Sequence, residues 1–203
     1  MYDDQLQLIE WGFAGMPLRG EEVSGDSYII KPIPDGILIA VVDGLGHGYE
    51  AAAASKIAIT TLDTYAHEPV IMLVRRCHEA LKGTRGVVMS IAKLNSHDKM
   101  ISWLGVGNIE GLVSRGNGRS VISHERLLLR GGTLGYHLPT LKEAVIPFIN
   151  GDTLIFVTDG IRSNFDSGIK LEDMPQKIAD YIMAHFNRGT DDALVLVVRY
   201  KCK

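Results

Sequence analysis

The sequence predicts an α+β protein built on an antiparallel β-sandwich, and three observations support this prediction. Apolar, β-branched runs of strand length recur along the 203-residue chain, with turn residues between them. Helical periodicity is confined to three segments. The resulting order of strands, two helices, many strands, one helix and a final strand lacks the alternation that is typical of a doubly wound parallel sheet.

The N-terminal segment predicts three strands. Loose alternation of apolar residues up to Trp11 indicates an edge or half-buried strand. Residues 24–33 and 36–42 indicate two further strands. The segment 34–36 reads Pro-Asp-Gly, a strong turn signal, so these two strands are expected to form a hairpin.

Three helices are expected. Residues 49–65 are rich in alanine, and apolar side chains recur there at helical spacing. Pro69 suits the first turn of a second helix that runs to about residue 81, because the amide hydrogen that proline lacks has no helical partner in that turn. The third helix is expected over residues 174–186, where apolar side chains share one face.

The rest of the chain is predicted to be mainly β. We expect a four-stranded β-meander, then a hairpin that turns at residues 150–152, and a last strand over 193–200. The strands of the meander are predicted at 86–94, 99–106, 109–113 and 120–123, and those of the hairpin at 145–148 and 153–157.

Composition limits the possible functions. The formal net charge is -3 and the basic residues are scattered, which argues against nucleic acid or an anionic membrane as a partner. Cys77 and Cys202 have no metal-ligand spacing and suggest no disulfide framework, so a reducing, cytoplasmic location is expected. Residues 1–20 contain no signal sequence, and the apolar runs are too short to span a bilayer. We expect a single domain over residues 1–203.

Acidic residues lie beside the apolar runs at four places. These are Asp26, Asp43, Asp159 and the adjacent pair Asp191 and Asp192. A carboxylate at the end of a buried strand is held rigidly at the rim of the sheet, and several converging carboxylates form an all-oxygen site for Mg²⁺ or Mn²⁺. Since neighbouring strand residues point to opposite faces, only one member of the adjacent pair is expected to enter the site.

The glycine-rich loop over residues 43–48 reads Asp-Gly-Leu-Gly-His-Gly and allows three interpretations. It can be a plain turn, a cradle for a nucleotide phosphate, or a metal site that uses Asp43 and the carbonyl of Gly44. The phosphate-binding glycine motifs are absent, and Asp43 would repel phosphate unless a cation lay between them. Metal ligation is therefore favoured.

Taken together, these segments resemble the motifs of metal-dependent serine/threonine phosphatases of the protein phosphatase 2C type, in the same order. The matching segments are residues 25–27, 43–52, 105–108, 131–135, 158–160 and 189–193. The bacterial branch that contains SpoIIE, RsbU and RsbX is the most similar, and within it the RsbX-type stressosome phosphatases. The resemblance implies a β-sandwich with helices on both sides, in the order α-β-β-α.

The resemblance also implies two Mn²⁺ or Mg²⁺ ions. Asp43 would bridge both ions, and Asp26 would hold bound waters. A hydroxide shared by the ions would attack phosphoserine or phosphothreonine, and His47 would protonate the leaving oxygen. The implied metal-site residues are Asp26, Asp43, Gly44, Asp159, Asp191 and Asp192, and the implied catalytic residues are Asp43, Asp26 and His47.

The implied substrates are phosphorylated stressosome proteins of the RsbS or RsbR type. Residues 114–120 and 131–141 are expected to contact such a folded substrate, because this sequence shows no arginine clearly placed to bind the phosphate. Three alternatives remain open at this stage: a phosphatase for another anti-sigma-factor antagonist, a catalytically weak binding module of the same fold, and a metal-dependent nucleotide hydrolase.

Overall fold

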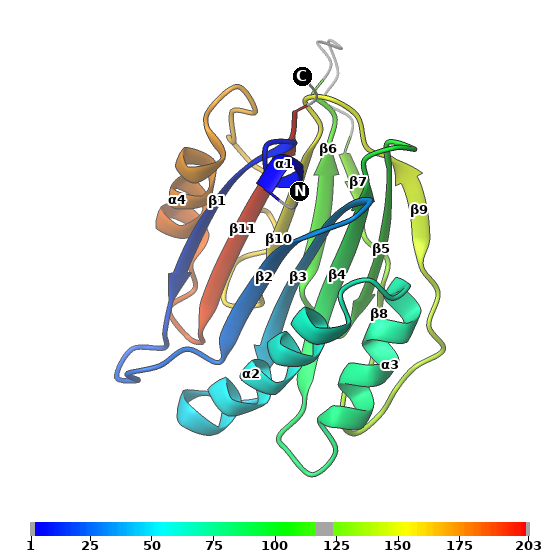
Figure 1. Cartoon of the computed structure of the whole chain (residues 1–203). Coiled ribbons are helices and arrows are strands. Elements are labelled where there is room, and N and C mark those ends of the chain that lie inside the picture. The colour runs from blue at the N-terminus through cyan, green and yellow to red at the C-terminus, as the bar shows by residue number, and fades with distance from the viewer. Residues whose placement is uncertain (1–2, 117–123, 202–203) are drawn as a thin grey trace.

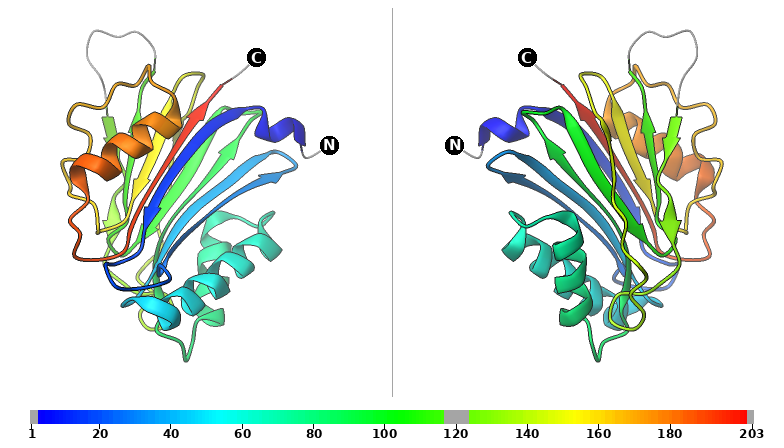
Figure 2. Two further views of the ribbon diagram at one scale, coloured as in Figure 1. Left: turned by 90° about the vertical axis from the view of Figure 1, so that its left-hand side faces the viewer. Right: turned by 90° about the vertical axis from the view of Figure 1, so that its right-hand side faces the viewer.

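Two β-sheets pack face to face, and helices cover both outer faces of the pair (Figures 1 and 2). The computed structural model describes residues 3–116 and 124–201. Its elements are α1 (Asp3–Leu6), β1 (Ile9–Met16), β2 (Asp26–Ile33), β3 (Gly36–Gly44), α2 (Gly48–Tyr65), α3 (Val70–Ala80), β4 (Val87–Asn95), β5 (Met100–Val106), β6 (Glu110–Ser114), β7 (His124–Arg126), β8 (Leu129–Arg130), β9 (Ala144–Pro147), β10 (Thr153–Val157), α4 (Pro175–Phe186) and β11 (Ala193–Tyr200). The sandwich with flanking helices that the sequence predicts is confirmed.

The strand order differs between the two sheets. The first sheet has the order β1-β11-β10-β6-β7, so the first and last strands of the chain are neighbours. The second sheet has the order β2-β3-β4-β5-β8, and β9 also pairs with β5. Pairing is antiparallel except between β5 and β8.

Alternating side chains of the central strands build three apolar layers. In β3, Leu38, Ala40 and Val42 pack with α2 and α3, whereas Ile37 and Ile39 face the other sheet. The strand is therefore buried on both faces, which explains why its sequence is an unbroken apolar run. A third layer lies between the first sheet and α4 (Figure 2).

Two of the predicted strand pairings are wrong. The expected meander is divided between the sheets, because β4 and β5 belong to the second sheet while β6 and β7 belong to the first. The chain changes sheets at Gly107, whose φ of +102° and close approach to Val88 leave no room for a side chain. The predicted strand at 120–123 lies outside the described residues.

The expected hairpin after residue 144 is also wrong. Strand β9 pairs with β5, whereas β10 pairs with β6 and β11, so the turn at 150–152 connects two sheets. Turn residues fix a local change of direction, but they do not specify which strand the chain joins next.

The described helices include none that is long and apolar enough to cross a membrane. The C-terminal ends of β3 and β10 meet at the end of the sandwich where α2 begins (Figure 1). The predicted acidic positions follow or flank these strand ends.

Candidate active site

Asp26 and Asp43 lie directly opposite each other at the end of the β2–β3 hairpin. Ile33 pairs with Gly36 at the turn, and the register brings Asp26 opposite Asp43 at the far end. Side chains of directly opposed residues are neighbours on one face, and like charges there destabilise the sheet. A short turn and two strands of matched length therefore place two carboxylates side by side.

Thr158, just beyond β10 of the first sheet, contacts this pair through a hydrogen bond to Asp26. The Thr158 hydroxyl donates a hydrogen bond of 2.7 Å to Oδ2 of Asp26, and it accepts one of 2.8 Å from the backbone N–H of Leu194. The next residue, Asp159, accepts a 2.7 Å hydrogen bond at Oδ2 from Nδ2 of Asn108. These contacts bring acidic side chains from both sheets to the same end of the sandwich.

The protein supplies too little positive charge to this cluster. Burial, and then repulsion by Asp26 and the other nearby aspartates, raises the pKa of Asp43 to about 9. Burial also raises the pKa of Asp26 to about 7, although the hydrogen bond from Thr158 opposes this shift. The pKa of Asp159 is raised as well, by burial and by Asp191.

A hollow of about 440 Å³ opens over these side chains, and we call it the carboxylate hollow. It is lined by Asp43, Leu45, Gly46, Val88, Gly107, Asn108, Gly131, Gly132, Thr133, Asp159 and Asp191. Three carboxylates and no lysine or arginine occur among these lining residues. Asp26, Gly44, His47 and Asp192 are not among them.

The donor set fits Mn²⁺ or Mg²⁺. Oδ1 of Asp26 is buried and has no hydrogen-bond partner among the described residues. Such an oxygen is costly unless a cation or a water ordered by one satisfies it. Within residues 3–116 and 124–201, no three His, Cys, Asp or Glu side chains are close enough to hold an ion by themselves. Magnesium-type sites keep several waters and use few protein ligands, so converging but separated carboxylates suit them.

Asp191 and Asp192 occupy different environments. Asp191 is exposed and lines the carboxylate hollow. Asp192 is 3% exposed, and its two carboxylate oxygens accept hydrogen bonds from the backbone N–H groups of Leu18 (2.7 Å) and Gly25 (2.6 Å). The geometry therefore favours Asp191 as the residue that reaches a cation, while Asp192 fixes the segment that leads into β2.

His47 and Gly44 lie beside the hollow without lining it. His47 precedes the first residue of α2, and its Nδ1 lies 2.5 Å from Oε1 of Glu21. The imidazole is thus paired with a carboxylate outside the hollow, and its role as a proton donor stays a prediction. Gly44 packs so closely on Ala51 that an added Cβ would lie 2.2 Å from its carbonyl oxygen. Only glycine therefore fits between β3 and α2.

Sequence reasoning missed two residues of the site. The sequence places Asn108 only within the family-like segment 105–108, yet its side chain binds Asp159. The sequence likewise places Thr158 only within the family-like segment 158–160, yet its hydroxyl links Asp26 to β11. Side-chain contacts between strands that are distant in sequence leave no local pattern, which explains both omissions.

The chain matches the family model of stage II sporulation protein E (SpoIIE) over residues 34–201. It is 29% identical over 168 residues to the phosphoserine phosphatase RsbX of Bacillus subtilis (strain 168), covering 80% of this chain and 82% of that protein.

Solved structures show a similar fold. A chain from a study of the bacterial stressosome as a modular system adapted to control secondary messenger signalling has a TM-score of 0.84 and 28% identity, with coverage of 94% of this chain and 99% of that one. The crystal structure of RsbX in complex with magnesium also has a TM-score of 0.84, at 24% identity, with coverage of 95% and 96%. Since the family model covers most of the chain, this protein belongs to the SpoIIE family of serine/threonine protein phosphatases.

Proposed function

We propose that residues 1–203 form a single catalytic domain that removes phosphate from phosphoserine or phosphothreonine of stressosome proteins of the RsbS or RsbR type. The proposed cofactors are two Mn²⁺ or Mg²⁺ ions, and the proposed location is the cytoplasm. The observation that carries the proposal is the half-buried, mutually repelling pair Asp26 and Asp43, with a buried and unpartnered Oδ1 on Asp26 among the described residues. A site that serves only binding has no physical need to keep these carboxylates together.

Each acidic residue has a proposed role. Asp43 would contact both cations, and Asp159 and Asp191 would complete the shell of one of them. Asp26 would hold waters through its free oxygen while Thr158 fixes its other oxygen. Gly44 would offer its carbonyl, and Asp192 would position the segment before β2.

The cations, when bound, lower the pKa of water towards neutrality and offset charge on the phosphoryl group. The chain's own residues orient the reactants. Asn108 restrains the Asp159 carboxylate, which keeps this side chain at the carboxylate hollow. The open hollow leaves room for a phosphorylated side chain to approach in line with the attacking water.

Two features support the substrate class. RsbX is a phosphoserine phosphatase, and a structurally similar chain comes from a study of the bacterial stressosome. The predicted substrate-contacting segment 131–141 begins at the hollow, since Gly131, Gly132 and Thr133 line it. The other predicted segment, 114–120, starts at the opposite end of the sandwich, because Arg115 binds Asp152 there. Its described part therefore cannot contact a phosphate in the hollow.

The first experiment separates an enzyme from a binding module. We expect p-nitrophenyl phosphate to be hydrolysed with Mn²⁺ and the activity to disappear with a chelator. The second experiment incubates the protein with phosphorylated proteins of the RsbS or RsbR type and follows loss of phosphate by mass spectrometry. Turnover of p-nitrophenyl phosphate without dephosphorylation of these proteins would indicate another protein substrate.

A further inference from the structure

A second hollow of about 410 Å³ adjoins the carboxylate hollow, and its chemistry is different. It is lined by Leu45, Gly46, Arg85, Thr133 and Tyr136. Leu45, Gly46 and Thr133 line both hollows, so a chain segment bound in one extends directly into the other. We call the second one the Arg85 hollow.

Arg85 supplies the positive charge that the first hollow lacks. It is the one lysine or arginine among the described residues that line either hollow. Its guanidinium lies over Gly46, where an added Cβ would be 2.5 Å from Nη1. The φ of Gly46 is +89°, so the backbone shape favours glycine at this position, and the absence of a side chain lets the Arg85 guanidinium approach closely.

The backbone that carries Arg85 is held from both sides. The hydroxyl of Tyr136 donates a 2.7 Å hydrogen bond to the carbonyl of Thr84, and the N–H of Leu45 donates one of 3.1 Å to the carbonyl of Gly86. The N–H of Gly86 also donates to Oγ1 of Thr84 at 3.0 Å. A fixed backbone lowers the entropy cost of holding a ligand at the tip of this side chain.

Arg85 forms an ion pair with Glu50 in the first turn of α2. The side chains of Arg85 and Glu50 are 49% and 70% exposed, and exposed pairs of this kind contribute little stability. A carboxylate from a substrate can therefore replace Glu50 or share the guanidinium with it. The planar donor fork of arginine suits a carboxylate in either case.

We propose, on the basis of the phosphatase function proposed above, that Arg85 is a specificity residue that binds an acidic side chain beside the phosphorylated residue of the substrate. The phosphate would occupy the carboxylate hollow, and the neighbouring segment would cross Leu45 and Gly46. Tyr136 is 67% exposed and Leu45 is 37% exposed, so they offer apolar contacts on the way. The charges favour this arrangement, because the aspartates of the carboxylate hollow repel an acidic substrate side chain whereas Arg85 attracts it.

The test compares pairs of phosphoserine peptides that differ by a single Glu or Gln, placed in turn at one to three residues on either side of the phosphoserine. At the preferred position, the wild-type protein should favour the Glu peptide by about tenfold in kcat/KM, as one charge-assisted hydrogen bond predicts. Arg85→Gln should reduce this ratio to about one, while Arg85→Lys should keep part of it. Hydrolysis of p-nitrophenyl phosphate, which has no flanking residue, should be unchanged in both variants.

Two controls exclude a merely structural role. Glu50→Gln breaks the same ion pair but leaves Arg85 free, so the preference for Glu should be kept or increased. Arg75→Gln removes an equal charge from an exposed position of α3 that lines neither hollow, and should change nothing. Loss of the preference in Glu50→Gln would overturn the proposal.

Other results would also overturn it. One is a wild-type protein that shows no preference for Glu at any position, and another is an Arg85→Gln variant that keeps the preference. A third is an Arg85→Gln variant that loses as much activity on p-nitrophenyl phosphate as on the Glu peptide, because Arg85 would then bind the phosphoryl group itself. Failure of the wild-type protein to hydrolyse p-nitrophenyl phosphate with Mn²⁺ would instead reject the proposed phosphatase function, and this inference with it.

Discussion

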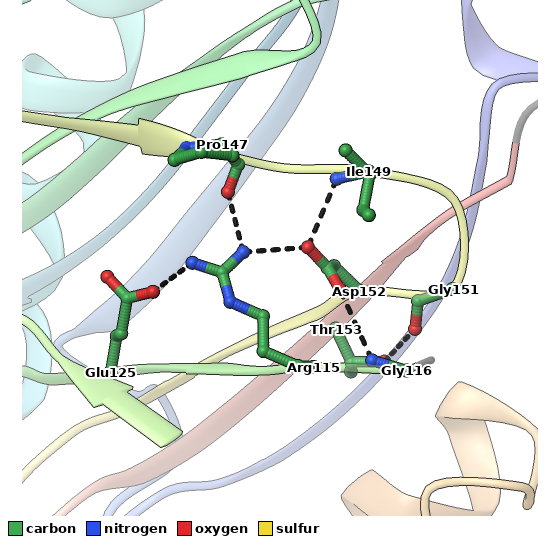
Figure 3. A network of polar contacts seen from close by, with 8 residues as sticks. All are labelled: Arg115, Gly116, Glu125, Pro147, Ile149, Gly151, Asp152 and Thr153. Atoms are coloured by element: carbon green, nitrogen blue, oxygen red, sulfur yellow. Dashed lines mark hydrogen bonds and ion pairs between the residues drawn. The ribbon is translucent and has the colours of Figure 1, made fainter. Parts of the chain in front are cut away.

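Acidic side chains lie at both ends of strand β10, but the protein supplies hydrogen-bond and ion-pair partners for them at only one end. Asp152, just before the strand, is 1% exposed and accepts hydrogen bonds from Nη1 of Arg115 (2.7 Å) and from the N–H groups of Ile149 (3.1 Å) and Gly116 (3.2 Å) (Figure 3). Arg115 also donates to the carbonyl of Pro147 and pairs with Glu125 (Figure 3). At this end the protein supplies the cation itself.

At the other end, beyond Thr158, no arginine or lysine is among the described residues that line the carboxylate hollow. Asp26 has one oxygen bound by Thr158 and one without a partner among the described residues, and Asp43 has a pKa raised to about 9. A buried carboxylate paired by the fold is structural, whereas one left unpaired is ready for a cation from solution. The comparison therefore supports the proposed metal site at the unsatisfied end.

The largest expected effect is on activity at the unsatisfied end. Asp43→Asn removes the proposed shared ligand and should lower kcat for p-nitrophenyl phosphate with Mn²⁺ by at least about 10³-fold, equal to about 4 kcal/mol. Circular dichroism checks that the variant is folded. A folded Asp43→Asn protein with wild-type turnover would show that Asp43 does not have this role.

The next effect is on stability at the satisfied end. Asp152→Ala leaves the charge of Arg115, which is 18% exposed, without its buried partner and should lower the free energy of unfolding by about 3 kcal/mol. Asp63→Asn is the matched control, because it breaks the exposed Lys31–Asp63 ion pair and should cost less than about 1 kcal/mol. Urea unfolding measures both values, and similar small losses would mean that the Asp152 network adds no more than a surface pair.

Without metal, an Asp→Asn substitution should change the free energy of unfolding in opposite directions at the two ends of β10. At pH 8 the raised pKa makes Asp43 take up a proton on folding, a cost that Asn does not have, so the metal-free Asp43→Asn variant should be more stable than the wild type by about 1 to 2 kcal/mol. Asp152→Asn weakens a satisfied network and should be destabilising. Destabilisation by Asp43→Asn in chelator would contradict the comparison.

The pH dependence of stability without metal follows from the direction in which the pKa of Asp43 is shifted. Between its ordinary value of 3.8 and its folded value of about 9, Asp43 binds a proton more tightly in the folded protein than in the unfolded chain. The contribution of this group to stability is therefore full at low pH and falls as pH rises through that range. Thermal melts in chelator should show a shallower decline with pH for Asp43→Asn than for the wild type.

The smallest expected effect distinguishes the adjacent aspartates. Asp191→Asn should raise the Mn²⁺ concentration needed for half-maximal activity more than Asp192→Asn does, since Asp191 lines the hollow and Asp192 is bound by Leu18 and Gly25. Asp192→Asn should instead lower stability, because an amide cannot accept both backbone hydrogen bonds equally well. An equal or larger rise in this Mn²⁺ concentration for Asp192→Asn would contradict the proposed roles of the two residues.

Much of this fold is predictable from sequence because its strands and helices have clear local periods. The apolar run of β3, the hairpin turn before it and the three main helices of the structure follow from residue spacing and turn chemistry. The place of β6 and β10 in the first sheet, away from β5 and β9, does not, because packing of the whole core determines which strands far apart in the chain become partners. The order of the layers follows from the resemblance to a known family, because local patterns alone do not predict it.

The site divides in the same way. The hairpin register predicts that Asp26 and Asp43 meet, but the bonds from Thr158 to Asp26 and from Asn108 to Asp159 depend on how the sheets pack. The placement of Arg85 beside Gly46 likewise joins segments about forty residues apart in the chain. Long-range contacts of this kind leave no spacing for sequence reasoning to use.

The most direct test of the account is isothermal titration calorimetry of the metal-free protein with Mn²⁺. The account predicts weak binding of two ions to the wild-type chain, because such sites keep most of their waters, and loss of this binding in Asp43→Asn. Asp152→Asn should bind Mn²⁺ as the wild type does, since its carboxylate already has a partner. Absence of Mn²⁺ binding to the wild-type protein at millimolar concentration would contradict the central claim that the unsatisfied end of the sandwich is a metal centre.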